Sequence, residues 1–273
     1  MEGINFKTPQ YKYYLTPRQY PIQVAVEQDI ERDDIQTFAK AGILQVFAMV
    51  LAKASEWCGK KLMQGKEFTT AENVKKIADE MLFKNNLKDK VAVKYIDSSN
   101  VKHITNAIKT NSGLDMTKEL ETVARGANAF YSDNLKLAVA PSSKPSLILH
   151  ELGHAITAHK GKFMKFMQNS RMMAASIPTL LLIANSMIPK KQGEETFIEK
   201  HAGKIGFCAF LPTILEEGLA SLRGIKAANT IKKSINMNLK PLKRNYTFAW
   251  LTYVISGLGL GIAAKQSILE NKQ

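Results

Sequence analysis

Apolar and polar positions divide the chain into a first part of short amphipathic elements and a last part of long apolar runs. Residues 1–34 are polar, and we expect an irregular arm there. A helical spacing of apolar residues then runs from Asp34 to about Leu62. Its apolar stretch, 41–52, is too short for an ordinary membrane span. The pattern therefore predicts a buried or interfacial helix.

The middle of the chain switches between helical and strand periods. Thr69 and Thr70 are suited to cap a second helix, whose apolar face recurs at helical spacing. The elements predicted after it are a strand at 91–97, one or two short helices within 101–125 and a hairpin after Gly126, with its turn at 132–134 and its second arm at 135–140. We expect these strands to form a small antiparallel sheet just before the helix that follows.

Three apolar runs, 172–188, 205–215 and 246–264, fill the last part of the chain. The run at 246–264 has no charged residue and reaches the ~20 residues that a membrane span requires, whereas 172–188 is of marginal length. We interpret 172–215 as an apolar membrane hairpin and 246–264 as a further span. The alternative is a large soluble domain with these helices in its core.

Residues 150–154 read His-Glu-Leu-Gly-His. Residues four apart share one face of a helix, so His150 and His154 can present two imidazoles to one metal ion. The carboxylate of Glu151 cannot easily join the same coordination sphere, but it can reach a water molecule at the metal. Zinc lowers the pKa of water, and a nearby carboxylate can relay its proton to a leaving amine. The motif thus predicts hydrolysis, against the alternative of a chance match on an amphipathic helix.

A catalytic zinc usually has three protein ligands and an open position, so a third ligand is needed. His159 lies five residues after His154, on a different face of the helix. His201 lies in a charged segment that we expect to be a solvated loop. Both remain alternatives to the glutamates further along the chain.

Glu217 is the preferred third ligand, on a helix that we expect Pro212 to begin. Its face carries small residues that would let this helix approach the histidine helix closely: Ala220, Ser221 and Gly224. Glu216 lies about 100° away around the helix, so the two carboxylates cannot serve equally. Replacing Glu217 should therefore weaken zinc binding, and replacing Glu216 should be mild. In the alternative interpretation both glutamates are a solvated charge pair.

The order of these motifs resembles the membrane gluzincins, in which a His-Glu-x-x-His helix and an apolar segment precede Glu-x-x-Ala-Asp or Glu-x-x-Ala-Ser. The segment "EGLASLR" looks closest to the YugP-like neutral zinc metallopeptidases, and more distantly to the HtpX-like and CaaX-protease families. The likeness covers roughly residues 126–225. It implies zinc, three ligands and a catalytic base: His150, His154, Glu217 and Glu151. Ser221 stands where many of these enzymes have an aspartate that supports a ligand histidine.

Charge and cysteine content refine this picture. The net charge is +14, yet no arginine-rich or aromatic-interleaved stretch points to nucleic acid, so membrane lipid is the preferred anionic partner. Basic residues flank the apolar runs, whereas the loop at 189–204 is nearly balanced, which places the catalytic site at the cytoplasmic face of a membrane. Cys58 and Cys208 are far apart, which favours free thiols in a reducing compartment.

The sequence therefore predicts an α+β protein, mostly helical, with a zincin-like catalytic domain and C-terminal transmembrane helices. Its expected parts are an N-terminal helical region of unknown role (1–90), the metallopeptidase domain (91–225) and a basic linker with a hydrophobic helix (226–273). The expected function is zinc-dependent hydrolysis of a peptide or protein substrate, which the strand at 135–140 is a candidate to pair with. The alternative is a membrane-bound scaffold or binding protein with structural zinc, which would have no use for Glu151. Arg223 and Tyr246 are candidates to stabilise the oxyanion.

Overall fold

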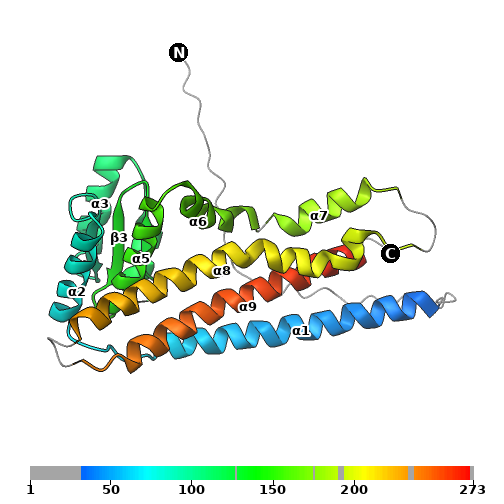
Figure 1. Cartoon of the computed structure of the whole chain (residues 1–273), viewed down its shortest axis with the longest axis horizontal. Coiled ribbons are helices and arrows are strands. Elements are labelled where there is room, and N and C mark those ends of the chain that lie inside the picture. The colour runs from blue at the N-terminus through cyan, green and yellow to red at the C-terminus, as the bar shows by residue number, and fades with distance from the viewer. Residues whose placement is uncertain (1–31, 127, 175, 190–193, 233–236, 271–273) are drawn as a thin grey trace, which may run out of the picture.

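A computed structural model of the chain describes residues 32–126, 128–174, 176–189, 194–232 and 237–270. The expected polar arm lies outside these residues as far as position 31. Figure 1 shows an α/β head at one end of the molecule and long helices that extend from it toward the other end. The prediction of a mostly helical chain with a small sheet is confirmed.

The head contains the shorter elements. In chain order they are α2 (Ala71–Lys84), β1 (Ala92–Ile96), α3 (Val101–Ser112), α4 (Thr117–Ala124), β2 (Phe130–Ser132), β3 (Leu137–Pro141), the 3-10 turn η1 (Pro145–Leu147) and α5 (Ile148–His159). The Thr70 hydroxyl accepts the backbone N–H of Asn73 and so caps α2, as predicted. The expected apolar face of α2 is buried against α5: Val74, Ile77, Met81 and Leu82.

The sheet has the strand order β1-β3-β2. The predicted antiparallel hairpin is confirmed in β2 and β3, but the sheet as a whole is mixed and not antiparallel. β2 pairs with β3 antiparallel through Phe130 and Val139, but β1 pairs with β3 parallel, from Ala92 opposite Leu137 onward. The chain between β1 and β3 is long enough to cross over, and period-two alternation does not encode strand direction. Because β3 has a strand on both sides, it is not the free edge that we expected to bind substrate.

The long helices are α1 (Arg32–Met63), α8 (Phe197–Ile231) and α9 (Lys240–Glu270), and α9 packs against both α8 and α1 (Figure 1). Pro212 lies inside α8 and does not begin a helix, which corrects the prediction. Packing of α8 on α9 offsets the lost backbone hydrogen bond: Gly206 and Gly257 approach the facing helix, and Trp250 donates to the Ile214 carbonyl at 3.0 Å.

The apolar run at 172–188 is divided between α6 (Lys162–Ala174) and α7 (Ile177–Ser186), because Pro178 stands in the first turn of α7 and favours a new helix there. With ten residues α7 is too short to cross a membrane, so the predicted hairpin of two spans at 172–215 is wrong. By contrast, α8 and α9 are each long and apolar enough to do so. Exposed side chains such as Phe47, Leu215 and Leu258 add apolar surface to these long helices, which suggests membrane association.

Candidate metal centre

Helix α5, which carries the His-Glu-Leu-Gly-His motif, packs directly on the second half of α8. A Cβ atom on Gly153 would lie 2.6 Å from the Cα of Ala220 and 2.5 Å from its carbonyl oxygen. One on Gly224 would lie 3.1 Å from the carbonyl oxygen of Leu149. Only small residues permit such close backbone contact, so the expectation of a close approach between these helices is confirmed.

The start of α5 is held by residues from distant parts of the chain. The Glu67 carboxylate accepts hydrogen bonds from the Ser146 backbone N–H at 3.2 Å and from its hydroxyl at 2.9 Å. The Tyr246 hydroxyl donates to the Ser146 carbonyl at 2.7 Å. Burial raises the pKa of Glu67, although the Ser146 hydrogen bonds and Lys144 oppose the shift. No local pattern marks Glu67 as a cap, because it lies 79 residues before its partner.

Three ligand atoms from the two helices converge. His150 Nε2 lies 3.0 Å from His154 Nε2 and 3.1 Å from Glu217 Oε2, and His154 Nε2 lies 3.5 Å from the same oxygen. Ligands at about 2.0–2.1 Å from a tetrahedral zinc ion are separated by about 3.3–3.4 Å. The triangle therefore has the size that a single metal ion of this kind requires.

The other ring nitrogens face polar partners on α8. His154 Nδ1 lies 2.6 Å from Glu216 Oε1, and His150 Nδ1 lies 3.1 Å from the Ser221 hydroxyl. Such partners fix the orientation and tautomer of imidazoles that bind metals. Glu216 and Glu217 are almost fully buried, so the alternative of a solvated charge pair is wrong. The contact of Glu216 could not be anticipated, because sequence does not reveal where the His154 ring points.

Glu151 lies beside the triangle. The side chain is buried, and a carboxylate oxygen lies within 4.8 Å of ligand nitrogens of both His150 and His154. The carboxylate is therefore close enough to act on a small molecule held at the triangle. The side chain of His150 is 13% exposed, more than those of His154 and Glu217, so solvent reaches the site on the side of His150.

The other residues considered from the sequence lie outside this cluster. His159 is exposed at the end of α5, where its ring contacts the Ala155 carbonyl. His201 lies within α8, with its ring tilted against that of Phe197, and not in a solvated loop. Arg223 donates to the Gly153 carbonyl at 2.8 Å. The ring of Tyr246 lies 5.6 Å from that of His150, with its hydroxyl turned to Ser146.

The donor set also fits a metal ion electrostatically. The carboxylates of Glu151, Glu216 and Glu217 are buried around two imidazoles, and burying charges of one sign together costs free energy unless a positive charge compensates them. A divalent cation at the centre of the triangle would supply that compensation. The cluster can therefore bind a metal ion.

An apolar groove of about 360 Å³ runs between α8 and α9 beside the cluster. Ser221 and Tyr246, which contact His150, line it together with aliphatic and aromatic residues such as Leu222 and Trp250. Comparison with family models, with curated proteins and with solved structures found no match to this chain. The class of protein must therefore be inferred from the cluster and the helices themselves.

Proposed function

We propose that the protein is a zinc-dependent metallopeptidase of the gluzincin type, with an order of motifs that resembles the YugP-like enzymes. The observation that supports this most strongly is the triangle of His150, His154 and Glu217 with the Glu151 carboxylate beside it. Two histidines and one carboxylate form a common ligand set of catalytic zinc, which leaves one position open. The same donors also suit other divalent metals, but the adjacent carboxylate favours hydrolysis.

Each residue has a distinct task in this proposal. Zinc, when bound, activates water and polarises the scissile carbonyl group. The Glu151 carboxylate accepts a proton from the attacking water and then donates it to the nitrogen of the leaving amine, so that proton transfer balances over the reaction. The Glu216 carboxylate accepts a hydrogen bond from Nδ1–H of His154, which keeps the Nε2 lone pair directed at the metal position. The Ser221 hydroxyl accepts a hydrogen bond from Nδ1–H of His150 and orients that ring in the same way.

The proposed location is a membrane, with α8 and α9 as the spanning helices and peptides or proteins as substrates. Support comes from the length and apolar composition of both helices. Glu216 and Glu217 lie on the half of α8 that packs against the head (Figure 1), and the basic segment 223–244 begins within this half. By the positive-inside rule that end of the helices, and with it the site, faces the cytoplasm.

The alternative function is a membrane-bound scaffold or binding protein with structural zinc. The burial of the ligands favours it: the side chains of His154 and Glu217 are 10% and 1% exposed. A structural site, however, needs no carboxylate poised beside an open metal position.

Replacement of Glu151 separates the two functions. We expect Glu151→Gln to keep one zinc ion per chain, measured by elemental analysis, and to lose about 10²–10⁴-fold in turnover of a fluorogenic peptide library. The exposed Glu119→Gln is the matched control and should retain both properties. Full turnover in Glu151→Gln would contradict the catalytic assignment. Zinc binding without turnover in the unaltered protein, across the whole library, would favour the scaffold.

A further inference from the structure

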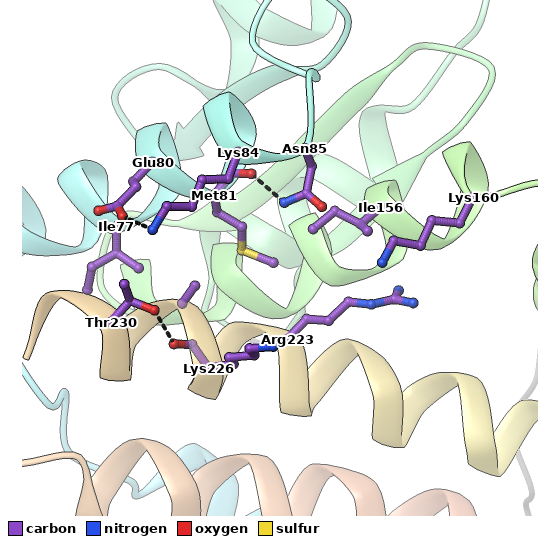
Figure 2. Close-up of a pocket in the computed structure, with 11 residues that line it drawn as sticks. Ile77, Glu80, Met81, Lys84, Asn85, Ile156, Lys160, Arg223, Lys226 and Thr230 are labelled. Carbon is purple, nitrogen blue, oxygen red and sulfur yellow. Dashed lines mark hydrogen bonds and ion pairs between the residues drawn. The ribbon is translucent and has the colours of Figure 1, made fainter.

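A second hollow, of about 210 Å³, lies between α2, the end of α5 and the last turns of α8 (Figure 2). Its inner wall is apolar and includes Ile77, Met81 and Ile156. Its lining includes none of the residues of the candidate metal centre, which are His150, Glu151, His154, Glu216 and Glu217. It is therefore a separate site, reached from the surface of the head.

The rim of this hollow is strongly basic. Four cationic side chains line it: Lys84, Lys160, Arg223 and Lys226. Glu80 is the one acidic residue of the lining, and it already forms an ion pair with Lys84. Within the described part of the chain, Lys160 and Lys226 form no salt bridge with any carboxylate. Apart from Lys84, three positively charged side chains therefore surround the hollow, and their mutual repulsion favours a bound anion.

Arg223 is the fixed member of this group. Its Nη1 donates to the Gly153 carbonyl at 2.8 Å and to the Thr157 hydroxyl, which anchors the half-buried guanidinium against α5. Both of these bonds use the same nitrogen, Nη1. The buried Glu216 carboxylate attracts the guanidinium electrostatically, but the other N–H groups of the fork remain available for an acceptor in the hollow. Figure 2 shows Lys160 reaching toward Arg223 from the end of α5, across the opening.

We propose that this hollow binds a phosphate group. Phosphate carries up to two negative charges and several acceptor oxygens, which match an anchored guanidinium and two flexible ammonium groups. The chemistry is the same for a lipid headgroup and for a soluble phosphate compound. A headgroup would be well placed, because Leu222, next to Arg223, is 62% exposed and would contact lipid if α8 lies in a membrane.

Binding is tested by calorimetry on the purified full chain in neutral detergent, with two probes used separately: inorganic phosphate, and short-chain phosphatidic acid with short-chain phosphatidylcholine as its blank. The variant is Lys160→Gln/Lys226→Gln, which leaves Arg223 and its helix contacts in place. At about 1 kcal/mol for each lysine near a phosphate, the pair should weaken binding about thirtyfold. The matched control, Lys75→Gln/Lys118→Gln, removes the same charge from exposed positions outside the hollow.

Phosphate binding that the first variant loses and the control retains would support a soluble ligand. Binding of phosphatidic acid that the first variant loses and the control retains, without binding of inorganic phosphate, would support a lipid headgroup. Equal losses in variant and control would show nonspecific charge attraction and overturn the proposal, as would no binding of either probe. Binding that the lysine variant fully retains, for example at the metal centre, would also overturn it. Zinc content and peptide turnover are not readouts here, so the peptidase proposal stands or falls separately.

Discussion

His154 Nδ1 lies 2.6 Å from Glu216 Oε1, while Nε2 of the same ring lies 3.5 Å from Glu217 Oε2. Adjacent glutamates on one helix therefore flank a single imidazole. Consecutive side chains project about 100° apart around a helix, so the carboxylates of Glu216 and Glu217 leave α8 in different directions. The ring of His154 lies between these two side chains. Glu217 can then bind a metal at Nε2, and Glu216 can orient the ring from behind.

Replacing the two glutamates should have effects of different size. We expect Glu217→Ala to eliminate measurable zinc binding, because a ligand is lost. Glu216→Ala should weaken zinc binding about 10–100-fold, because the His154 ring loses its orienting partner. The contact of Glu216 thus changes the expectation from sequence that this substitution would be mild. Competition with a chromophoric chelator measures both affinities.

Glu121→Ala, at an exposed position of α4, is the control and should bind zinc as tightly as the unaltered chain. If Glu216→Ala abolished zinc binding and Glu217→Ala did not, the ligand and the orienting residue would be exchanged. If neither substitution altered zinc affinity, the third ligand would lie elsewhere. The gluzincin assignment would then fail.

Gly153→Ala should disrupt the site without removing any ligand. The new methyl group would lie 2.5 Å from the Ala220 carbonyl oxygen, so α5 must move away from α8. Such overpacking costs about 1–3 kcal/mol of unfolding free energy and would separate both histidines from Glu217. We expect reduced stability in urea unfolding together with weaker zinc binding. Gly59→Ala, with nothing within 4 Å of the added methyl, is the control and should retain zinc affinity. Unchanged zinc affinity in Gly153→Ala would contradict the proposed ligand geometry.

The contacts of the site differ in how far sequence could predict them. Helical spacing put His150 and His154 on one face, and the small residues near Glu217 correctly indicated close packing with α5. These inferences use distances within one helix, which the sequence determines. The cap that Glu67 provides and the ring orientation behind the Glu216 contact depend on tertiary structure, and no local pattern encodes that.

In the overall fold, too, local sequence patterns did not predict features of the sheet and of α8 that depend on tertiary contacts. Alternating residues predicted the strand that became β1 but not its parallel pairing, because side chains alternate in the same way in both directions. Pro212 indicated a helix start from its local preference, yet packing against α9 keeps α8 continuous. Tertiary contacts therefore overrode local preferences at both places.

Asp133 should contribute stability that is lost in acid. Burial alone would raise its pKa, but hydrogen bonds from Lys136, Lys165 and Tyr131 outweigh it and hold the pKa at about 2, below the ordinary 3.8. A lowered pKa means that the contribution is complete above about pH 4 and is lost as the pH falls through 2. Asp133→Asn should thus lower the urea midpoint at pH 7, and the difference from the unaltered chain should be much smaller at pH 2 and vanish below it. The exposed Asp89→Asn is the control. A difference that persists unchanged to pH 2 would contradict this role.

Insertion of α9 in a membrane can be tested at its outward face. The Leu258 side chain is 43% exposed and lies near the middle of the apolar part of α9. If this surface contacts lipid, Leu258→Lys should cost about 2.5–3.5 kcal/mol of insertion free energy. We expect the unaltered chain to resist carbonate extraction from membranes and Leu258→Lys to be extracted or degraded.

The control for that experiment is Phe83→Lys, which places the same charge on the head at a side chain that is 70% exposed. It should behave like the unaltered chain, because water already surrounds that position. In a soluble protein both lysines would be equally tolerated, since each replaces an exposed apolar side chain. A chain that stays soluble without detergent, with Leu258→Lys as stable as Phe83→Lys, would therefore refute the membrane location. The metal centre would be unaffected by that result, because its ligands depend on the packing of α5 on α8 and not on lipid.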